Sequence, residues 1–180
     1  MAAIKAIVFD RDGTLNVDGT TPGGYLTNPD ELQLLPGARE ALRLAREAEV
    51  LPFVFTQQSC IGKGLLTEEV LEEIHDKMQT LLGHAARVER FYHCPHVADD
   101  GCACRKPAAG MLKQLQADYG FAAHEVLVIG DNTRDGEAAH NAGMDFVFVR
   151  TGKGAPDAAE VFGNRARFYK DALAAVQAMI

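Results

Sequence analysis

The stretch "IKAIVFDRDGTLN" (residues 4–16) places two aspartates directly after an apolar run and follows them with glycine. Residues 4–9 are predicted to form the first strand of a sheet. In an open parallel sheet, ligands bind at the edge formed by the carboxyl ends of the strands, so Asp10 and Asp12 are expected at a binding edge. An ordinary Asp-Gly turn would explain "DGT" but not the aspartate before it. Because two carboxylates on one short loop repel each other, the pair predicts a divalent cation, and hard oxygen ligands favour Mg²⁺.

The rest of the chain alternates short apolar runs with amphipathic helical patterns, which is typical of βαβ units around a buried parallel sheet. The predicted fold class is α/β, with a three-layer α/β/α sandwich and a Rossmann-like parallel sheet. Strands are predicted at 4–9, 50–56, 88–93, 125–131 and 145–149, and helices at 36–50, after Thr67, from Pro107 to Gly120, at 136–143 and at 171–180. The helix after Thr67 has a predicted buried stripe of Val70, Leu71, Ile74, Met78 and Leu81. Residues 152–166 show no clear pattern.

Length and charge limit the functional classes. The 180 residues suit one domain, and the net charge of −7 argues against a polyanion-binding surface, so nucleic acid is not an expected partner. No apolar run approaches the ~20 residues that cross a bilayer, and the N-terminal stretch reaches charged residues too early for a secretory signal. We therefore expect a single-domain, cytoplasmic monomer without membrane contact.

Polar residues also follow the other predicted strands. Asp131 and Asp135 lie in "VIGDNTRD", Thr56 ends the strand at 50–56, and Lys106 lies in "CRKP". If the strand ends converge, the carboxylates, the hydroxyl and the ammonium group would surround one cation and one anionic ligand.

A cluster of Cys94, His96, Cys102 and Cys104 has the ligand types and number of a closed tetrahedral zinc site. The alternative is a set of unpaired cysteines, but a loop of Asp, Gly and Ala offers no apolar core in which to bury thiols. A disulfide within Cys-x-Cys is sterically unfavourable. We therefore expect structural Zn²⁺ in a loop at about 94–104.

The motifs "FDRDGTLN", "VFTQQS", "RKP" and "VIGDNTRD" together resemble the four motifs of the haloacid dehalogenase (HAD) superfamily of phosphatases. Their spacing leaves no room for a large cap domain. The resemblance implies that Asp10 attacks phosphorus to form an aspartyl-phosphate and that Asp12 acts as general acid and base, which requires a raised Asp12 pKa. It also implies that Lys106 and Thr56 hold phosphoryl oxygens, and that Mg²⁺ is bound by Asp10, Asp131 and the backbone carbonyl of Asp12.

The cysteine cluster resembles the zinc-bearing branch of this superfamily, whose members act on heptose 1,7-bisphosphate or histidinol phosphate. The stretches "GYLTNPDELQLLPGA" and "QSCIGKGLLT" favour the heptose subgroup and a small sugar phosphate as substrate, although Gln57, Cys60 and Lys63 depart from its usual residues. The substrate-binding residues implied are Gln57, Gln58, Ser59, Lys63 and Arg105. A histidinol-phosphate phosphatase, a broader sugar-phosphate phosphatase and a non-catalytic phospho-ligand-binding module remain alternatives; the module has no need of a nucleophile and an acid.

Overall fold

The computed structural model describes residues 3–180 and contains a six-stranded sheet in the order β3-β2-β1-β4-β5-β6. Every pairing between neighbouring strands is parallel. The strands are β1 (Ala6–Phe9), β2 (Leu51–Gln57), β3 (Phe91–Cys94), β4 (Val126–Gly130), β5 (Asp145–Val149) and β6 (Phe168–Tyr169). The chain builds outward from β1 to β3 and then returns to the other side of β1 with β4. The strand order therefore reverses between β1 and β4, where ligands bind in folds of this kind.

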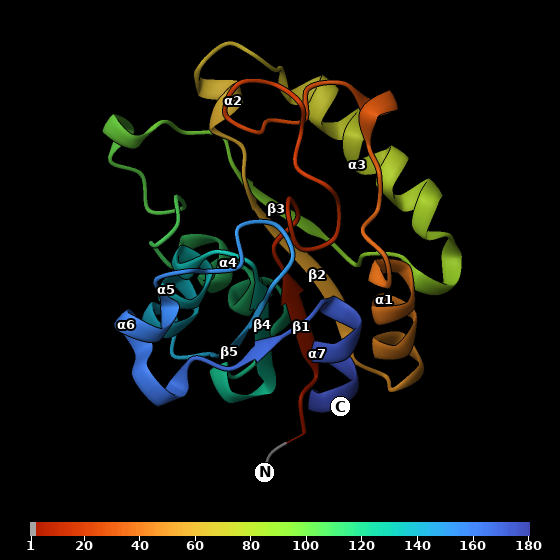
Figure 1. Ribbon diagram of the computed structural model, residues 1–180, viewed down its shortest axis with the longest axis vertical. Helices are drawn as coiled ribbons and strands as arrows, with labels where there is room; N and C mark the ends of the chain where they lie inside the picture. The colour runs from red at the N-terminus through yellow and green to blue at the C-terminus, as the bar shows by residue number, and fades with distance from the viewer. Residues whose placement is uncertain (1–2) are drawn as a thin grey trace.

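Helices cover both faces of the sheet, so the predicted three-layer α/β/α fold is confirmed (Figure 1). One face is covered by α1 (Ala38–Glu47), α3 (Glu68–Leu82) and α7 (Ala172–Met179). The other is covered by α4 (Gly110–Tyr119), α5 (Thr133–Asn141) and α6 (Ala158–Phe162). A short helix, α2 (Ser59–Gly62), follows β2.

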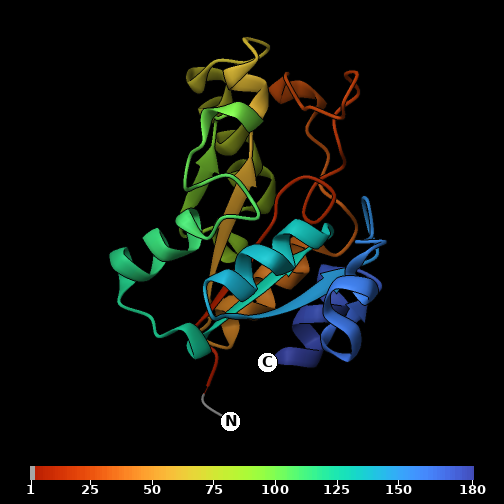
Figure 2. The same cartoon turned by 90° about the vertical axis from the view of Figure 1, so that its left-hand side faces the viewer.

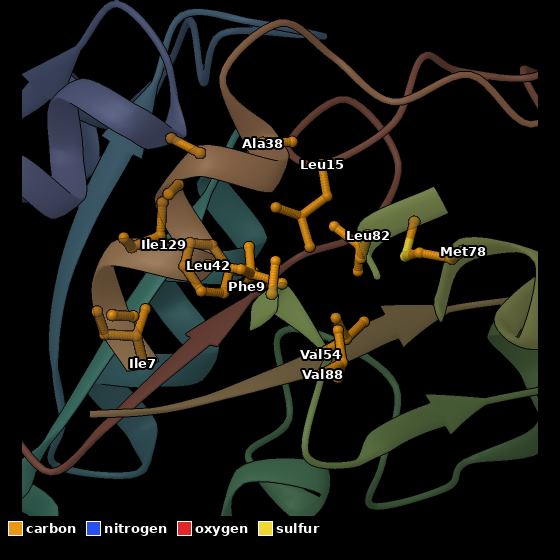
Figure 3. Close-up of a cluster of buried hydrophobic side chains, with 14 of the residues drawn as sticks. Ile7, Phe9, Leu15, Ala38, Leu42, Val54, Met78, Leu82, Val88 and Ile129 are labelled. Atoms are coloured by element: carbon orange, nitrogen blue, oxygen red, sulfur yellow. The ribbon is translucent and has the colours of Figure 1, made fainter. Parts of the chain in front are cut away.

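The two central strands, β1 and β4, are apolar and buried at every position, because their successive side chains point to opposite faces that are both covered by helices. In β1, Ile7 and Phe9 belong to one core cluster and Ala6 and Val8 to the other. Figure 3 shows the first cluster, in which Phe9 lies among side chains from helices and neighbouring strands. Fully burying a side chain of this size contributes about 1.5–3 kcal/mol, so the two clusters hold both helical layers on the sheet.

The buried stripe of α3 differs from the prediction at both ends, since Val70 is only partly buried and Leu82 takes the place of Leu81. Leu82 is fully buried, whereas Leu81 is 38% exposed. At about 100° per residue, Leu82 lies within about 20° of Leu71 around the helix, but Leu81 lies about 80° away. His75, which was not assigned to the stripe, is buried on it as well.

Other segments also differ from the prediction, α4 and α5 among them. Helix α4 begins at Gly110, so Pro107 precedes it and is not in its first turn. Helix α5 begins at Thr133 and not at 136, because the Asn132 side chain caps it by accepting from the backbone N–H of Arg134 at 3.1 Å. The unassigned segment 152–166 contains α6 and a short 3₁₀ helix at Gly163–Arg165.

No cap domain is inserted between β1 and α1, where residues 10–37 contain a single 3₁₀ helix at Pro29–Glu31. The turn within residues 10–37 and the segment around α2 lie beyond the carboxyl ends of the strands (upper part of Figure 2). Across residues 3–180, the helices are all too short or too polar to span a membrane.

Candidate active site

A buried lysine and three carboxylates meet at the point where the strand order reverses. Asp10 follows β1 and Asp131 follows β4, and because these strands pair directly, the two aspartates emerge side by side. Lys106, from the loop between β3 and α4, donates to Asp10 Oδ1 at 2.6 Å, Asp135 Oδ1 at 2.8 Å and the Phe55 carbonyl at 2.9 Å. The predicted convergence of separated motifs is therefore present in the fold.

The three carboxylates of this cluster carry more negative charge than the single Lys106 ammonium can balance. Burial raises the pKa of Asp10 well above its ordinary value, and Asp135 and Asp131 raise it further against the opposing charge of Lys106. Burial, followed by the charge of Asp135, raises the pKa of Asp131 to about 6. One carboxylate oxygen from each of the three aspartates lies within 4.8 Å of the others. A hard divalent cation fits this donor set and would relieve the repulsion.

Within the carboxylate cluster, Asp135 differs from the other two because both of its oxygens are already used. Its Oδ1 accepts from Lys106, and its Oδ2 accepts from the backbone N–H of Asn132 at 2.9 Å. Asp10 and Asp131 are therefore the better cation ligands, while Asp135 holds Lys106 and the start of α5.

Two glycines allow the chain to close around Asp131. Gly13 has a φ of +81°, and a Cβ at this position would lie 2.6 Å from Asp131 Oδ2. Gly152 has a φ of +56°, and a Cβ there would lie 2.3 Å from the same oxygen. The backbone N–H of Lys153 donates to Asp131 Oδ2 at 2.6 Å. The "TGKG" segment (residues 151–154) is thus a turn that packs against the "DGT" loop.

Asp12 lines the same pocket but has a different environment. Its two carboxylate oxygens accept from Arg11, from Asn16 Nδ2 at 2.9 Å and from Gln58 Nε2 at 2.8 Å. Although burial opposes ionisation, the Arg11 guanidinium and these hydrogen bonds lower the pKa of Asp12 below its ordinary value. The expectation of a raised Asp12 pKa is therefore wrong for the free protein, because the sequence did not reveal a buried guanidinium against this carboxylate.

The pocket contains most of the residues predicted to act on a phosphoryl group. Of the predicted set, it is lined by Asp10, Asp12, Thr56, Gln57, Lys106 and Asp131. Asp135, which the sequence placed near the cation without a specific role, also lines it, and sequence reasoning did not assign the remaining lining residues: Asp18, Gly24, Tyr25, Asn132, Arg134 and Lys153. Tyr25 lies in the "GYLT" stretch, but a single tyrosine in a loop gives no signal that separates contact with a ligand from packing.

The remaining predicted substrate-binding residues lie behind or beside the pocket wall. Gln58 and Ser59 are buried, and Gln58 Nε2 also donates to Thr56 Oγ1 at 2.8 Å. Lys63 Nζ donates to the Tyr25 hydroxyl at 2.6 Å. Arg105 Nη1 donates to the His96 carbonyl at 3.0 Å and, in the amide orientation that satisfies both groups, to the Gln57 side-chain oxygen at 2.8 Å.

The predicted zinc ligands converge in the loop after β3. Sγ of Cys104 lies 3.1 Å from Sγ of Cys94 and 3.5 Å from Sγ of Cys102, and 3.2 Å from Nδ1 of His96. In a tetrahedral site with Zn–S bonds of about 2.3 Å, the ligand atoms lie about 3.8 Å from one another. The distances between these ligand atoms are therefore close to those that zinc requires. The contact between Arg105 and the His96 carbonyl joins this cluster to the segment that carries Lys106.

The fold and the site agree with the comparisons to known proteins. A family model described as HAD-hydrolase-like matches residues 103–176. Curated phosphatases of 34–38% identity align with more than four-fifths of the chain. The chain therefore belongs to the HAD-like phosphatases.

Within that class, the similarity is to one kind of enzyme. The D-glycero-β-D-manno-heptose-1,7-bisphosphate 7-phosphatase of Bordetella bronchiseptica is 38% identical over 152 residues, covering 84% of this chain and 83% of the relative. The protein of the same name from Pseudomonas aeruginosa is 36% identical and covers 82% of each chain. A crystal structure of the B. bronchiseptica D,D-heptose 1,7-bisphosphate phosphatase, complexed with magnesium and phosphate, has a TM-score of 0.88 and covers 97% of both chains at 34% identity.

Proposed function

We propose that this phosphatase removes the 7-phosphate of D-glycero-D-manno-heptose 1,7-bisphosphate through an aspartyl-phosphate formed on Asp10. The observation that carries the chemistry is the Asp10 carboxylate at the end of β1, held in the pocket by the buried Lys106 ammonium at 2.6 Å. The substrate is supported by the relatives, which are named for this activity and align over more than four-fifths of their own length with the chain.

Mg²⁺ fits the oxygen donors of the site. Asp10 and Asp131 would hold it with their side chains, and Asp12 with its backbone carbonyl. When bound, the ion supplies positive charge that offsets the phosphoryl group and the clustered carboxylates. The raised pKa values of Asp10 and Asp131 support this, since buried carboxylates that lie close together resist ionisation unless a cation neutralises them.

In the first step, an Asp10 carboxylate oxygen attacks phosphorus while the bond from phosphorus to the sugar oxygen breaks, and Asp12 protonates the departing oxygen. In the second step, Asp12 removes a proton from water, which attacks the aspartyl-phosphate and releases inorganic phosphate and free Asp10. Lys106 and the Thr56 hydroxyl would hold the non-bridging oxygens. In the free protein the donors around Asp12 favour the ionised base, so the anionic substrate has to raise the Asp12 pKa for the first step.

We also propose that Cys94, His96, Cys102 and Cys104 bind a structural Zn²⁺. Four protein ligands leave no open position for a reacting water, so the metal orders the loop and takes no part in the chemistry. The spacing of the four ligand atoms and the hydrogen bond from Arg105 to the His96 carbonyl support this role.

Of the substrate-binding residues implied by the sequence, Lys63 and Arg105 are our candidates for binding the phosphate that is not transferred. Both lie one residue behind the pocket wall, since Lys63 contacts Tyr25 and Arg105 contacts Gln57. A second phosphate would have to displace or share these hydrogen bonds. Because Lys63 presents one ammonium group and not a planar fork, its contact with a phosphate is expected to be loose in geometry.

Phosphate release from a substrate panel tests the proposal. The panel contains heptose 1,7-bisphosphate, histidinol phosphate and simple sugar monophosphates, each assayed with and without Mg²⁺, and D10N serves as the inactive control. We expect the heptose bisphosphate to have the highest kcat/KM and turnover to require Mg²⁺. Faster turnover of histidinol phosphate would overturn the substrate assignment. Tight substrate binding without turnover of any compound would indicate a binding module.

A further inference from the structure

We propose that Arg11 and His75 form a positioning pair that aims the Asp12 carboxylate at the oxygen of the leaving group. The inference rests on the proposed function in one respect, namely that Asp12 is the general acid. Arg11 and His75 do not line the pocket, so they would act through Asp12 and not on the substrate.

Arg11 is fully buried beneath the carboxylate that it contacts. Its Nη2 donates to Asp12 Oδ2 at 3.0 Å and to Oδ1 at 3.1 Å, and its Nε donates to Oδ1 at 3.3 Å. A buried ion pair contributes little to stability compared with apolar residues of the same volume, so stability alone is a weak reason for a charge at this position. A planar guanidinium that donates to both carboxylate oxygens does, however, fix the direction of that carboxylate.

His75 holds the opposite end of the guanidinium. Its Nε2 lies 3.3 Å from Arg11 Nη1, and its ring stacks on Phe91 with centroids 4.2 Å apart and planes 13° apart. Burial, followed by the charge of Arg11, lowers the pKa of His75 to about 3. The ring is therefore neutral, and Nε2 acts as the acceptor for Arg11 while Nδ1 carries the proton.

This contact links α3 to the catalytic loop. Phe91 belongs to β3 and His75 to the core-facing stripe of α3, so the imidazole has little freedom to move. The Arg11 guanidinium thus lies between helix α3 and the Asp12 carboxylate. Asn16 and Gln58 donate further hydrogen bonds that fix Asp12. A displacement of about 1 Å in a catalytic group can cost about 100-fold in rate, so a positioning role is large enough to measure.

The test compares substrates whose leaving groups differ in their need for a proton. An alkyl sugar phosphate releases a poor leaving group that needs an acid, whereas p-nitrophenyl phosphate and acetyl phosphate release stable anions. For R11K, which keeps the charge but loses the fork, we expect the rate of sugar-phosphate cleavage to fall about 10–100-fold, within the range of general acid catalysis. The first-turnover rate with the two activated phosphates should stay within about threefold of the wild-type rate, by the same principle.

The His75 variants provide a matched pair. H75L removes the acceptor at nearly constant volume, and H75Q places an amide oxygen near the position of Nε2. We expect H75L to show the leaving-group dependence of R11K in weaker form and H75Q to restore the wild-type ratio of the two rates. Thermal unfolding of all variants shows whether each is folded, and this pair remains informative if R11K is not.

D12A separates failure of this inference from failure of the proposed function. If D12A slows both substrate classes equally, Asp12 is not the general acid and the proposed mechanism falls. If D12A is selective for poor leaving groups while folded R11K and H75L slow both classes equally, or neither, then Arg11 and His75 are structural and the positioning role is overturned.

Discussion

Lys106 donates a 2.6 Å hydrogen bond to Asp10 although 96 residues separate them in the sequence. The two residues come from different strand-to-helix connections, and Asp135 in a third connection accepts from the same ammonium group. Removal of this ammonium would leave buried carboxylates facing each other without their countercharge.

K106M is expected to reduce kcat by at least about 100-fold, because the phosphoryl group loses a positive partner in a water-poor site. The same change leaves Asp10 and Asp135 uncompensated, so the melting temperature should fall as well. Phosphate release and thermal unfolding measure the two effects. K113M, which removes an exposed lysine of α4, is the control and should change neither. Near-normal turnover of K106M would contradict the assignment of Lys106.

G13A is expected to destabilise the protein by about 1–3 kcal/mol and to raise the Mg²⁺ concentration needed for half-maximal turnover. The first effect arises because alanine is strained at positive φ, and the second because the new Cβ pushes against Asp131 Oδ2. G120A is the matched control: Gly120 has a φ of +73° with nothing within 4 Å of its Cβ position. It should lose stability by denaturant unfolding without changing the Mg²⁺ requirement. An equal shift in the Mg²⁺ requirement of both variants would show that the clash at Asp131 is unimportant.

C104S is expected to lose bound zinc and to unfold at a lower temperature, because a tetrahedral site loses one of four ligands. Elemental analysis of purified protein should give about one zinc per chain for the wild type and far less for C104S, in line with a single closed site. C60S changes a buried cysteine outside the cluster and should retain its zinc. Wild-type protein without zinc, purified in the absence of chelators, would rule out the structural metal.

His75 is expected to make the protein less stable as the pH falls. The unfolded chain binds a proton at this residue near pH 6.5, whereas the folded protein, with its His75 pKa lowered to about 3, does not. Protonation therefore favours the unfolded state, and the free energy of unfolding should fall by about 2 kcal/mol from this group between pH 7 and pH 5. Denaturant unfolding should show a shallower pH dependence for H75Q over this range. Identical slopes for H75Q and the wild type would mean that His75 is protonated in the folded state.

The local sequence pattern was sufficient to predict the class of fold and the general location of the site. The apolar runs of β1, β2, β4 and β5 are continuous and bounded by polar residues, so their prediction needed no tertiary information. The two-residue β6 was missed because a strand of that length has no periodicity to detect. Leu81 was misassigned because Leu82 follows it directly, so a shift of one residue in the apolar pattern selects the wrong leucine.

The sequence by itself determined which residue types were available: a pair of aspartates after a strand, a lysine and further aspartates at other strand ends, and three cysteines with a histidine in one loop. Tertiary structure alone decided that Arg11 is buried against Asp12, that Asp135 shares Lys106 with Asp10, and that Lys63 contacts Tyr25. The physical reason is that ionisation and hydrogen bonding depend on burial and on distances of a few ångströms between side chains. Those distances are set by how strands and loops far apart in the chain pack together, and a linear pattern of residue types does not contain them.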